Sequence, residues 1–153
     1  MMAGCIWVDA DACAVKSEVY KVAMRHGWRV WVVANQYIQT PQTDRIMCLV
    51  VAQGPDCADD LIAERVTAAD VVITDDIVLA SRCLAKKAAV LGQRGKEFTE
   101  DSIGDALAGR ELANELREMG VMSAGPKPIA QKDRSRFLGK LDQLLVARRG
   151  AVD

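Results

Sequence analysis

The sequence predicts a three-layer α/β fold with a central, mostly parallel five-stranded sheet flanked by helices. First, short apolar runs alternate along the chain with segments of helical period, and strand–helix alternation is typical of parallel sheets. Second, the runs are continuously apolar, as in strands that are covered on both faces. The length of 153 residues favours one domain over residues 1–153.

The strands and helices follow from this pattern in chain order. The continuous apolar runs predict strands at residues 5–8, 28–34, 46–52, 70–74 and 88–92. Apolar residues at helical spacing predict helices at residues 14–24, 57–66, 77–87, 102–120 and 132–149. The part of the chain from about 102 to 149 is therefore helical, apart from a turn or extended link at residues 125–131. We expect the strand order 3-2-1-4-5.

The connection between the second and third strands does not fit this pattern. Residues 36–45 contain Pro41 and show no helical period. A parallel crossover normally takes a dozen or more residues, and this segment is shorter. Either the segment crosses the sheet as a loop, or the third strand is antiparallel.

Composition and residue counts argue against several classes of protein. The net charge of −1 gives no sign of a polyanion partner, and no apolar run approaches the ~18 residues of a membrane span. The N-terminus lacks the basic region of a signal peptide. The five cysteines form no C-x-x-C pair and are expected as reduced thiols of a cytoplasmic protein. With His26 as the one histidine, Ser-His-Asp and Cys-His mechanisms have little support.

Acidic side chains follow three of the predicted strands. Ligands of open α/β sheets bind at the carboxyl ends of the strands, so we expect these acids to gather around one crevice. With the first and fourth strands adjacent, Asp9 and Asp76 would face each other across it. The acids are Asp9 and Asp11 after the first strand, Asp56, Asp59 and Asp60 after the third, and Asp75 and Asp76 after the fourth.

The charge pattern indicates a metal-assisted reaction on a phosphate. Residues 53–76 carry a net charge of −6, and residues 126–150 carry +5. An acidic pocket without His or Cys suits a hard cation bound by oxygen, Mg²⁺ or Mn²⁺. A basic segment near it suits phosphate. Together these features favour metal-assisted phosphodiester hydrolysis.

Each of these side chains also has a purely structural interpretation. Aspartate at a strand end is a common helix N-cap, although three clusters at one sheet end favour a shared site. The basic last helix is also typical of a solvated surface. Asn35 either orients substrate or caps a loop, and Arg94 either contacts a phosphate or belongs to a turn. Thr99 and Ser102 are expected to cap the helix that follows them.

Taken in order, the motifs resemble those of a known family. The segments VDADACAVK, VANQ, GPDCADDLI, DVVITDDIVLA, FTEDSIG and GPKPIAQKDRSRF are similar to the bacterial YaiI/YqxD proteins, UPF0178, also called DUF188, over nearly the whole chain. That family is similar to PIN-like and NYN nuclease domains, whose active site is a cluster of acids at the C-terminal ends of a parallel sheet. The resemblance implies a PIN-like fold and matches Asp9, Asp59 and Asp76 to that cluster, with Asp56 nearby.

The first function that these residues favour is a Mg²⁺- or Mn²⁺-dependent PIN-like nuclease. Its substrate would be RNA or another phosphodiester, and the metal would activate water. The oligomeric state cannot be predicted. The expected catalytic acids are Asp9, Asp11, Asp59 and Asp76, the metal ligands Asp9, Asp56, Asp59 and Asp76, and the substrate contacts Lys16, Asn35, Arg94, Arg134 and Arg136.

Two alternatives are also consistent with the sequence. One is a non-catalytic module that binds RNA or another partner. The other is a phosphatase of the haloacid dehalogenase type, because WVDADAC resembles its D-x-D strand end, with Asp9 as the nucleophile and Asp11 as the general acid. Residues 53–73 contain no lysine, which argues against the phosphatase.

Overall fold

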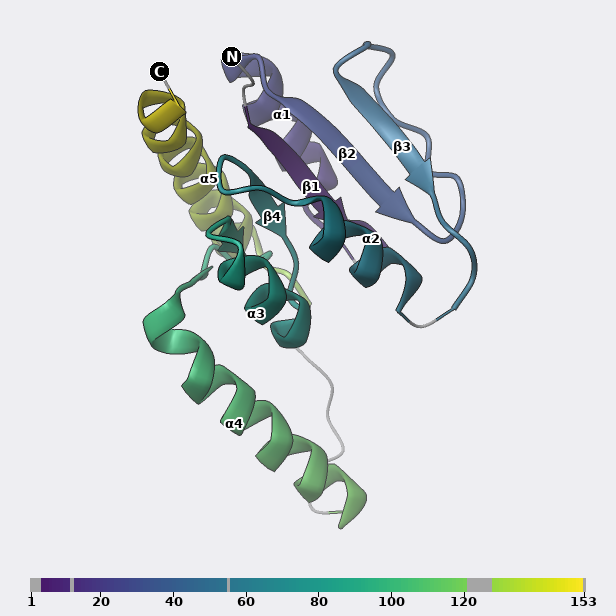
Figure 1. The fold of residues 1–153 in the computed structure, drawn as a ribbon, viewed down its shortest axis with the longest axis vertical. Helices are drawn as coiled ribbons and strands as arrows, with labels where there is room; N and C mark the ends of the chain where they lie inside the picture. Colours follow the sequence, from purple (N-terminus) through teal and green to yellow (C-terminus); the bar gives the residue numbers. More distant parts are fainter. Residues whose placement is uncertain (1–3, 12, 55, 121–127, 153) are drawn as a thin grey trace.

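A computed structural model shows a central sheet between two layers of helices (Figure 1). It describes residues 4–11, 13–54, 56–120 and 128–152, with side chains as far as residue 148. The sheet has six strands in the order β3-β2-β1-β4-β5-β6. The strands are β1 (Cys5–Asp9), β2 (Arg29–Ala34), β3 (Ile46–Val50), β4 (Val71–Ile73), β5 (Ala89–Leu91) and β6 (Glu97–Phe98).

The predicted fold class and the order of the first five strands are confirmed, and the predicted strand count needs one correction. The sixth strand, β6, pairs antiparallel with β5, with Val90 opposite Phe98. The turn between them is closed by a hydrogen bond from the Gly92 amide to the Lys96 carbonyl at 2.9 Å. A two-residue strand carries no apolar run, so the sequence pattern does not reveal it.

The connection between β2 and β3 is a loop, and β3 is parallel to β2. Val30 lies opposite Ile46, and the register continues to the ends of both strands. The two strands are neighbours, so residues 35–45 only have to return along one strand. A five-residue strand is roughly 17 Å long, and an extended segment of this length reaches about twice as far. The loop alternative is therefore the correct one, and no crossover helix is needed.

The helices lie in two layers, one on each face of the sheet. Side chains of α1 and α5 pack on one face, with Val19 and Phe137 fully buried there. Side chains of α2 and α3 pack on the other, among them Ile62 and Leu79. The helix α4 packs against α3 and has no buried residue. The helices are α1 (Lys16–His26), α2 (Cys57–Arg65), α3 (Ile77–Ala85), α4 (Glu100–Glu118) and α5 (Gln131–Val152).

Helix boundaries differ from the predicted ones by up to three residues because local caps set them. The first helix begins at Lys16 and ends at His26, each two residues later than predicted, and Gly27 caps its end with a φ of 73° that suits glycine. The Thr99 and Ser102 side chains form the predicted N-terminal cap of α4, in a capping box. Residues 125–127 of the predicted link at 125–131 lie outside the described residues; residues 128–130 belong to no helix or strand, and α5 begins at Gln131.

A buried aspartate fastens the strands at the end of the sheet where β4 begins. Asp70 is only 4% exposed. Its carboxylate accepts hydrogen bonds from the Cys5 amide at 2.8 Å, the Trp7 indole at 3.0 Å and the Thr67 amide at 2.8 Å. Asp70, one of the acids counted in the acidic segment 53–76, therefore has a structural role. It lies at the opposite end of β4 from the clustered aspartates.

Two expectations concern the whole chain. The five cysteines are free thiols in the structure, as predicted. Among the described residues, no helix is long and apolar enough to cross a membrane.

Candidate functional site

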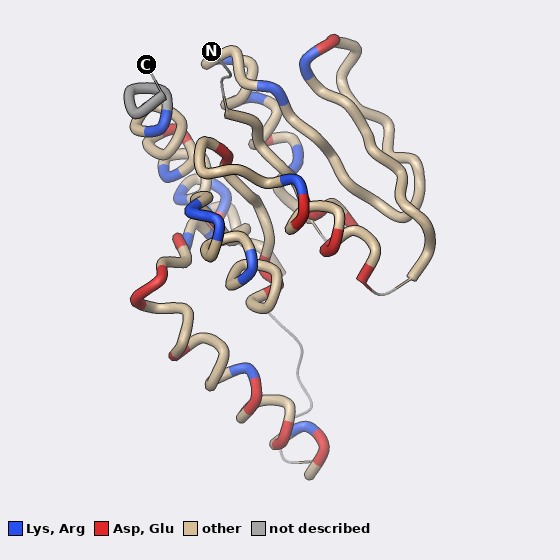
Figure 2. Tube along the Cα trace, in the orientation of Figure 1, with Lys and Arg blue, Asp and Glu red and all other residues tan. Residues whose placement is uncertain are grey.

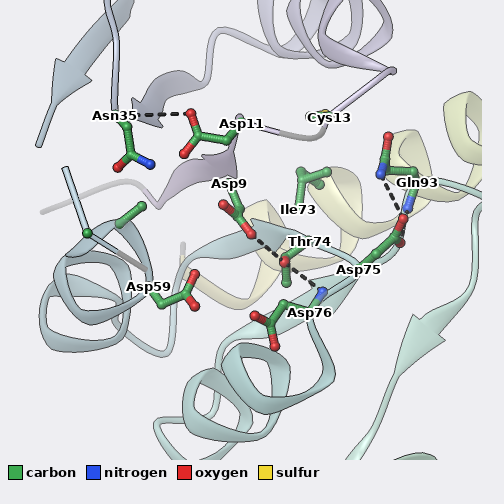
Figure 3. A pocket seen from close by; sticks show the side chains of 12 residues that line it. Asp9, Asp11, Cys13, Asn35, Asp59, Ile73, Thr74, Asp75, Asp76 and Gln93 are labelled. Carbon is green, nitrogen blue, oxygen red and sulfur yellow. Dashed lines mark hydrogen bonds between the residues drawn. The ribbon is translucent and has the colours of Figure 1, made fainter. Parts of the chain in front are cut away.

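A pocket of about 370 Å³ opens at the carboxyl ends of β1 and β4 (Figure 3). It lies where the sequence predicts a crevice between the first and fourth strands. The pocket brings together acids from three separate segments of the chain. The aspartates that line it are Asp9, Asp11, Asp59, Asp75 and Asp76.

Strand register brings Asp9 level with the end of β4. Val8 lies opposite Ile73 in the parallel pair, so Asp9 and Thr74 are the next residues along. The Thr74 hydroxyl donates to Asp9 Oδ2 at 2.9 Å and accepts from the Asp76 amide at 3.0 Å. Because Thr74 is 3% exposed, this single buried hydroxyl fixes both acids relative to each other.

Asp76 is both a helix cap and a pocket residue. Its Oδ1 accepts hydrogen bonds from the Val78 amide at 2.9 Å and the Leu79 amide at 3.2 Å, at the start of α3. The structural and the functional interpretations of this residue are thus compatible. Figure 3 shows the carboxylates of Asp9, Asp59 and Asp76 turned toward a common space.

Burial and the charges of neighbouring carboxylates raise the pKa of two of these acids, Asp59 and Asp9. Burial raises the pKa of Asp59 to about 7, and the charges of Asp9 and Asp76 and a hydrogen bond with Asp76 act in the same direction. Burial also raises the pKa of Asp9, opposed by the hydrogen bond from Thr74 and reinforced by the neighbouring Asp76 and Asp11. The pocket therefore favours any species that brings positive charge to these oxygens.

On another wall of the pocket, Asp11 meets the end of β2. The Oδ1 atom of Asp11 accepts a hydrogen bond from the backbone amide of Asn35 at 3.1 Å. The side-chain Oδ1 of Asn35 is buried and has no hydrogen-bond partner among the described residues. A buried amide oxygen is costly without a partner, so the pocket offers a polar atom to a bound molecule or ion.

The carboxylate of Asp75 accepts two hydrogen bonds from Gln93. Its Oδ1 accepts from the Gln93 backbone amide at 2.9 Å, and its Oδ2 accepts from the Gln93 side chain at 2.7 Å. The side-chain oxygen Oε1 of Gln93 in turn accepts a hydrogen bond from the Ala14 backbone amide at 2.5 Å. Gln93 therefore ties the loop after β1 to the loop after β4. Gln93 was not among the predicted site residues, although it follows the end of β5 by two residues and so lies at the same end of the sheet as the acids.

Two of the acids that follow the third strand do not line the pocket. Asp56 is exposed at the start of α2, although its charge acts on Asp59. Asp60 forms an ion pair with Arg82 at 2.8 Å on the surface. Among the three acids of this segment, only Asp59 is in the cluster, because one turn of helix points consecutive side chains in different directions.

The predicted cationic contacts lie outside the pocket lining. Lys16 donates to the Cys13 carbonyl at 2.6 Å and holds the loop after β1. Arg134 donates to the Ala14 carbonyl at 2.9 Å and pairs with Glu18. Arg94 and Arg136 both pair with Asp133, at 2.8 and 3.3 Å. These side chains fasten α5 and the loops around the site, whereas Asn35 is the one predicted substrate contact that lines the pocket.

The donor set suits a hard divalent cation that keeps much of its water. The pocket supplies carboxylate oxygens and the partnerless Asn35 oxygen, and oxygen ligands are what Mg²⁺ and Mn²⁺ prefer. Among the described residues, no three His, Cys, Asp or Glu side chains are grouped so that they could hold an ion. Mg²⁺ is commonly held by one or two carboxylates with several waters, which the arrangement allows. Binding by more acids would require them to move closer.

Comparison with known proteins identifies relatives along nearly the whole chain. The protein from Paramagnetospirillum magneticum called UPF0178 protein amb2838 is 55% identical over 140 residues, which cover 92% of this chain and 93% of the relative. A UPF0178 protein from Azorhizobium caulinodans is 54% identical, covering 92% and 89%. A UPF0178 protein from Caulobacter vibrioides is 50% identical over 99% of both chains.

These comparisons show the family of the chain but give no solved structure with a related fold. No solved structure matches the chain, so the PIN-like relationship is not shown. The family model described as uncharacterised, YaiI/YqxD, matches residues 7–147. That range contains the acid pocket and all the residues that line it. The chain therefore belongs to the DUF188 (YaiI/YqxD) family, also called UPF0178.

Proposed function

We propose that this protein is a Mg²⁺- or Mn²⁺-dependent phosphodiesterase of PIN-like type that hydrolyses RNA. The observation that carries the proposal is the meeting of Asp9, Asp59 and Asp76, from three segments of the chain, in one pocket at the carboxyl ends of β1 and β4. Burial first, and then the charges of Asp9 and Asp76, raise the pKa of Asp59 to about 7. The Asp59 carboxylate therefore resists ionisation, and a bound cation would stabilise its charged form.

One or two of Asp9, Asp59 and Asp76 would hold the ion directly and the others through its water, because the three carboxylates are not grouped closely enough to bind it together. A bound divalent ion would polarise a phosphate oxygen and make a water molecule a better nucleophile. The chain's own contribution is to hold the acids in place. Thr74 orients Asp9 through a hydrogen bond of 2.9 Å, and the first turn of α3 orients Asp76. Asp11, fixed by the Asn35 amide, forms the opposite wall.

A cleavage assay tests this proposal. Purified protein is incubated with single-stranded RNA and Mn²⁺, alongside the Asp9→Asn variant. Asparagine keeps the size of the side chain but removes its charge, so we expect the cleavage rate to fall by about 100-fold or more. Asp60→Asn is the matched control, because Asp60 lies on the surface in an ion pair with Arg82 and outside the pocket. Equal cleavage by the wild type and Asp9→Asn would refute the site.

The same assay separates the alternatives. Retention of RNA in a gel without cleavage, and without an effect of Mn²⁺, would identify a binding module. A phosphoaspartyl adduct on Asp9 would identify a phosphatase of the haloacid dehalogenase type. The nuclease is favoured over the phosphatase because no lysine is among the described residues that line the pocket, leaving no side-chain ammonium there to neutralise a phosphoaspartate.

A further inference from the structure

A second hollow, of about 560 Å³, adjoins the acid pocket on the side of α4. It lies between α4 and the turn that joins β5 to β6. Asp75 lines both hollows, so they meet at this residue. We call the second hollow the basic groove, because its charged lining residues are Arg94, Lys96, Arg110 and Arg117, with Asp75 at the junction.

The basic groove has its charge because α4 turns its cations and its acids in different directions. Figure 2 shows both signs along α4. Arg110 and Arg117 are seven positions apart, two helical turns, and therefore lie on the same face. Of the charged residues of α4, these two line the groove, and the acids Glu111, Glu115 and Glu118 do not. The groove is thus positive although the helix as a whole is acidic.

Most of this positive charge is not used within the protein. Lys96, Arg110 and Arg117 form no ion pair with any residue that the structure describes. Arg117 bonds to the neutral Asn114 side chain at 2.7 Å, and the Lys96 ammonium lies 5.9 Å from the Phe98 ring centre. Arg94 differs, because its guanidinium pairs with Asp133. Three cations are therefore available to an external anion.

The remaining lining of the groove is largely apolar. It includes Ile77, Phe98 and Ala106. Cations for a phosphate backbone beside apolar surface for bases are the features of a binding site for single strands. An acidic peptide would use the charge but not the apolar surface, and a mononucleotide would fill only part of the two adjoining hollows.

We propose that the basic groove binds the backbone of a single-stranded polynucleotide and leads it past Asp75 into the acid pocket. This inference deepens the proposed function. The part of it that leads the polynucleotide toward the acids rests on that proposed function. Binding itself does not depend on catalysis. In this proposal the groove supplies the phosphate contacts in place of Arg134 and Arg136 of α5, which are engaged with Glu18 and Asp133.

The test is the affinity of the full-length protein for a labelled oligonucleotide, measured by fluorescence anisotropy in EDTA so that no metal-dependent cleavage occurs. The probe is a single-stranded RNA of about 12 nucleotides. We expect the double variant Arg110→Ala, Arg117→Ala to bind about 10-fold more weakly at low salt. The slope of log K against log salt should fall in magnitude by about 1.4, since each lost phosphate contact on a single strand contributes about 0.7.

The matched control is Arg29→Ala, Arg65→Ala, which removes the same charge from exposed positions at the start of β2 and the end of α2. We expect less than about a twofold change in affinity for this control. Equal losses in both variants would overturn the groove as the binding site. So would wild-type protein that fails to bind the probe, or competition by uridine monophosphate or polyglutamate as effective as that by unlabelled RNA.

The outcome can be separated from that of the cleavage assay. If the Arg110→Ala, Arg117→Ala variant keeps full affinity while Asp9→Asn abolishes cleavage, the groove is wrong and the nuclease stands. If the groove variant loses affinity while no metal-dependent cleavage is found, the groove stands and the protein is a binding module. Circular dichroism of each variant checks that the exposed substitutions leave the fold intact.

Discussion

The buried hydroxyl of Thr74 offers the sharpest test of how the site is held together. Thr74→Val keeps the shape of the side chain and removes the hydroxyl. Asp9 then loses a hydrogen bond of 2.9 Å, and the Asp76 amide loses its acceptor at 3.0 Å. Thr74→Ser keeps the hydroxyl and is the matched control, at the cost of one buried methyl group, about 1 kcal/mol.

The size of the effect follows from the two bonds. A hydrogen bond to a charged group contributes about 1.5–3 kcal/mol, and an amide left without an acceptor costs about 1–3 kcal/mol when it is buried. Asp9 and Asp76 are partly solvated, so water offsets some of the loss. We expect Thr74→Val to lower the free energy of unfolding by about 2–4 kcal/mol at pH 7, which is about 5–15 °C in Tm for a domain of this size.

The dependence on pH identifies the partner of the hydroxyl. Burial raises the pKa of Asp9, so its carboxyl takes up a proton at a higher pH than an ordinary aspartate does, and toward acid pH the bond from Thr74 increasingly reaches a neutral group. Neutral hydrogen bonds contribute about 0.5–1.5 kcal/mol, so the cost of Thr74→Val should be smaller at pH 4 than at pH 7. Urea unfolding at both pH values measures this. A cost below about 0.5 kcal/mol at pH 7, or one independent of pH, would refute the reasoning.

Three further predictions concern other parts of the chain. Asp70→Ala should destabilise the protein by about 2–4 kcal/mol in urea unfolding, because it leaves the buried Trp7 indole and two partly buried backbone amides without their acceptor; a loss below about 1 kcal/mol would contradict this. The folded-state pKa of Asp59, about 7, exceeds its ordinary value, so stability is lost as pH rises from about 4 to about 7. Asp59→Asn should therefore raise Tm at pH 8 and not at pH 4; equal shifts would exclude the charge as the cause. Gln93→Ala should speed hydrogen exchange at the Ala14 amide, which loses its acceptor, and unchanged exchange would count against the bridge.

The fold was predictable because its signals are local. The strands of the parallel part are apolar runs separated by helical segments, and this alternation indicates the class and the layers, whereas the order of the five strands was an expectation that the runs themselves do not encode. Element ends were less predictable, since α1 begins at Lys16 without a side-chain cap at Val15. The strand β6 was missed because two residues show no period, and its pairing with β5 depends on a turn.

The site was predictable to the extent that backbone geometry determines it. Asp9 and Asp76 follow adjacent parallel strands, and topology alone places them at one end. The positions of the basic side chains depend instead on how α5 packs, which no local pattern encodes. Arg134 thus lies against Glu18 of α1, although the sequence offered it as a phosphate contact. Arg136 is different, because it pairs with Asp133 three positions before it in the same helix, a spacing that the sequence does show. Gln93 was missed because its partners are distant in the sequence.

The five carboxylates of the pocket differ in how far the protein itself satisfies them, and this decides which can bind something else. Asp75 is occupied at both oxygens by Gln93. Asp76 and Asp11 each give one oxygen to backbone amides. Asp59 accepts no hydrogen bond from a backbone amide among the described residues, and burial together with the charges of Asp9 and Asp76 raises its pKa to about 7. Because a cation stabilises most the carboxylate that the protein stabilises least, Asp59 should gain the most from bound metal.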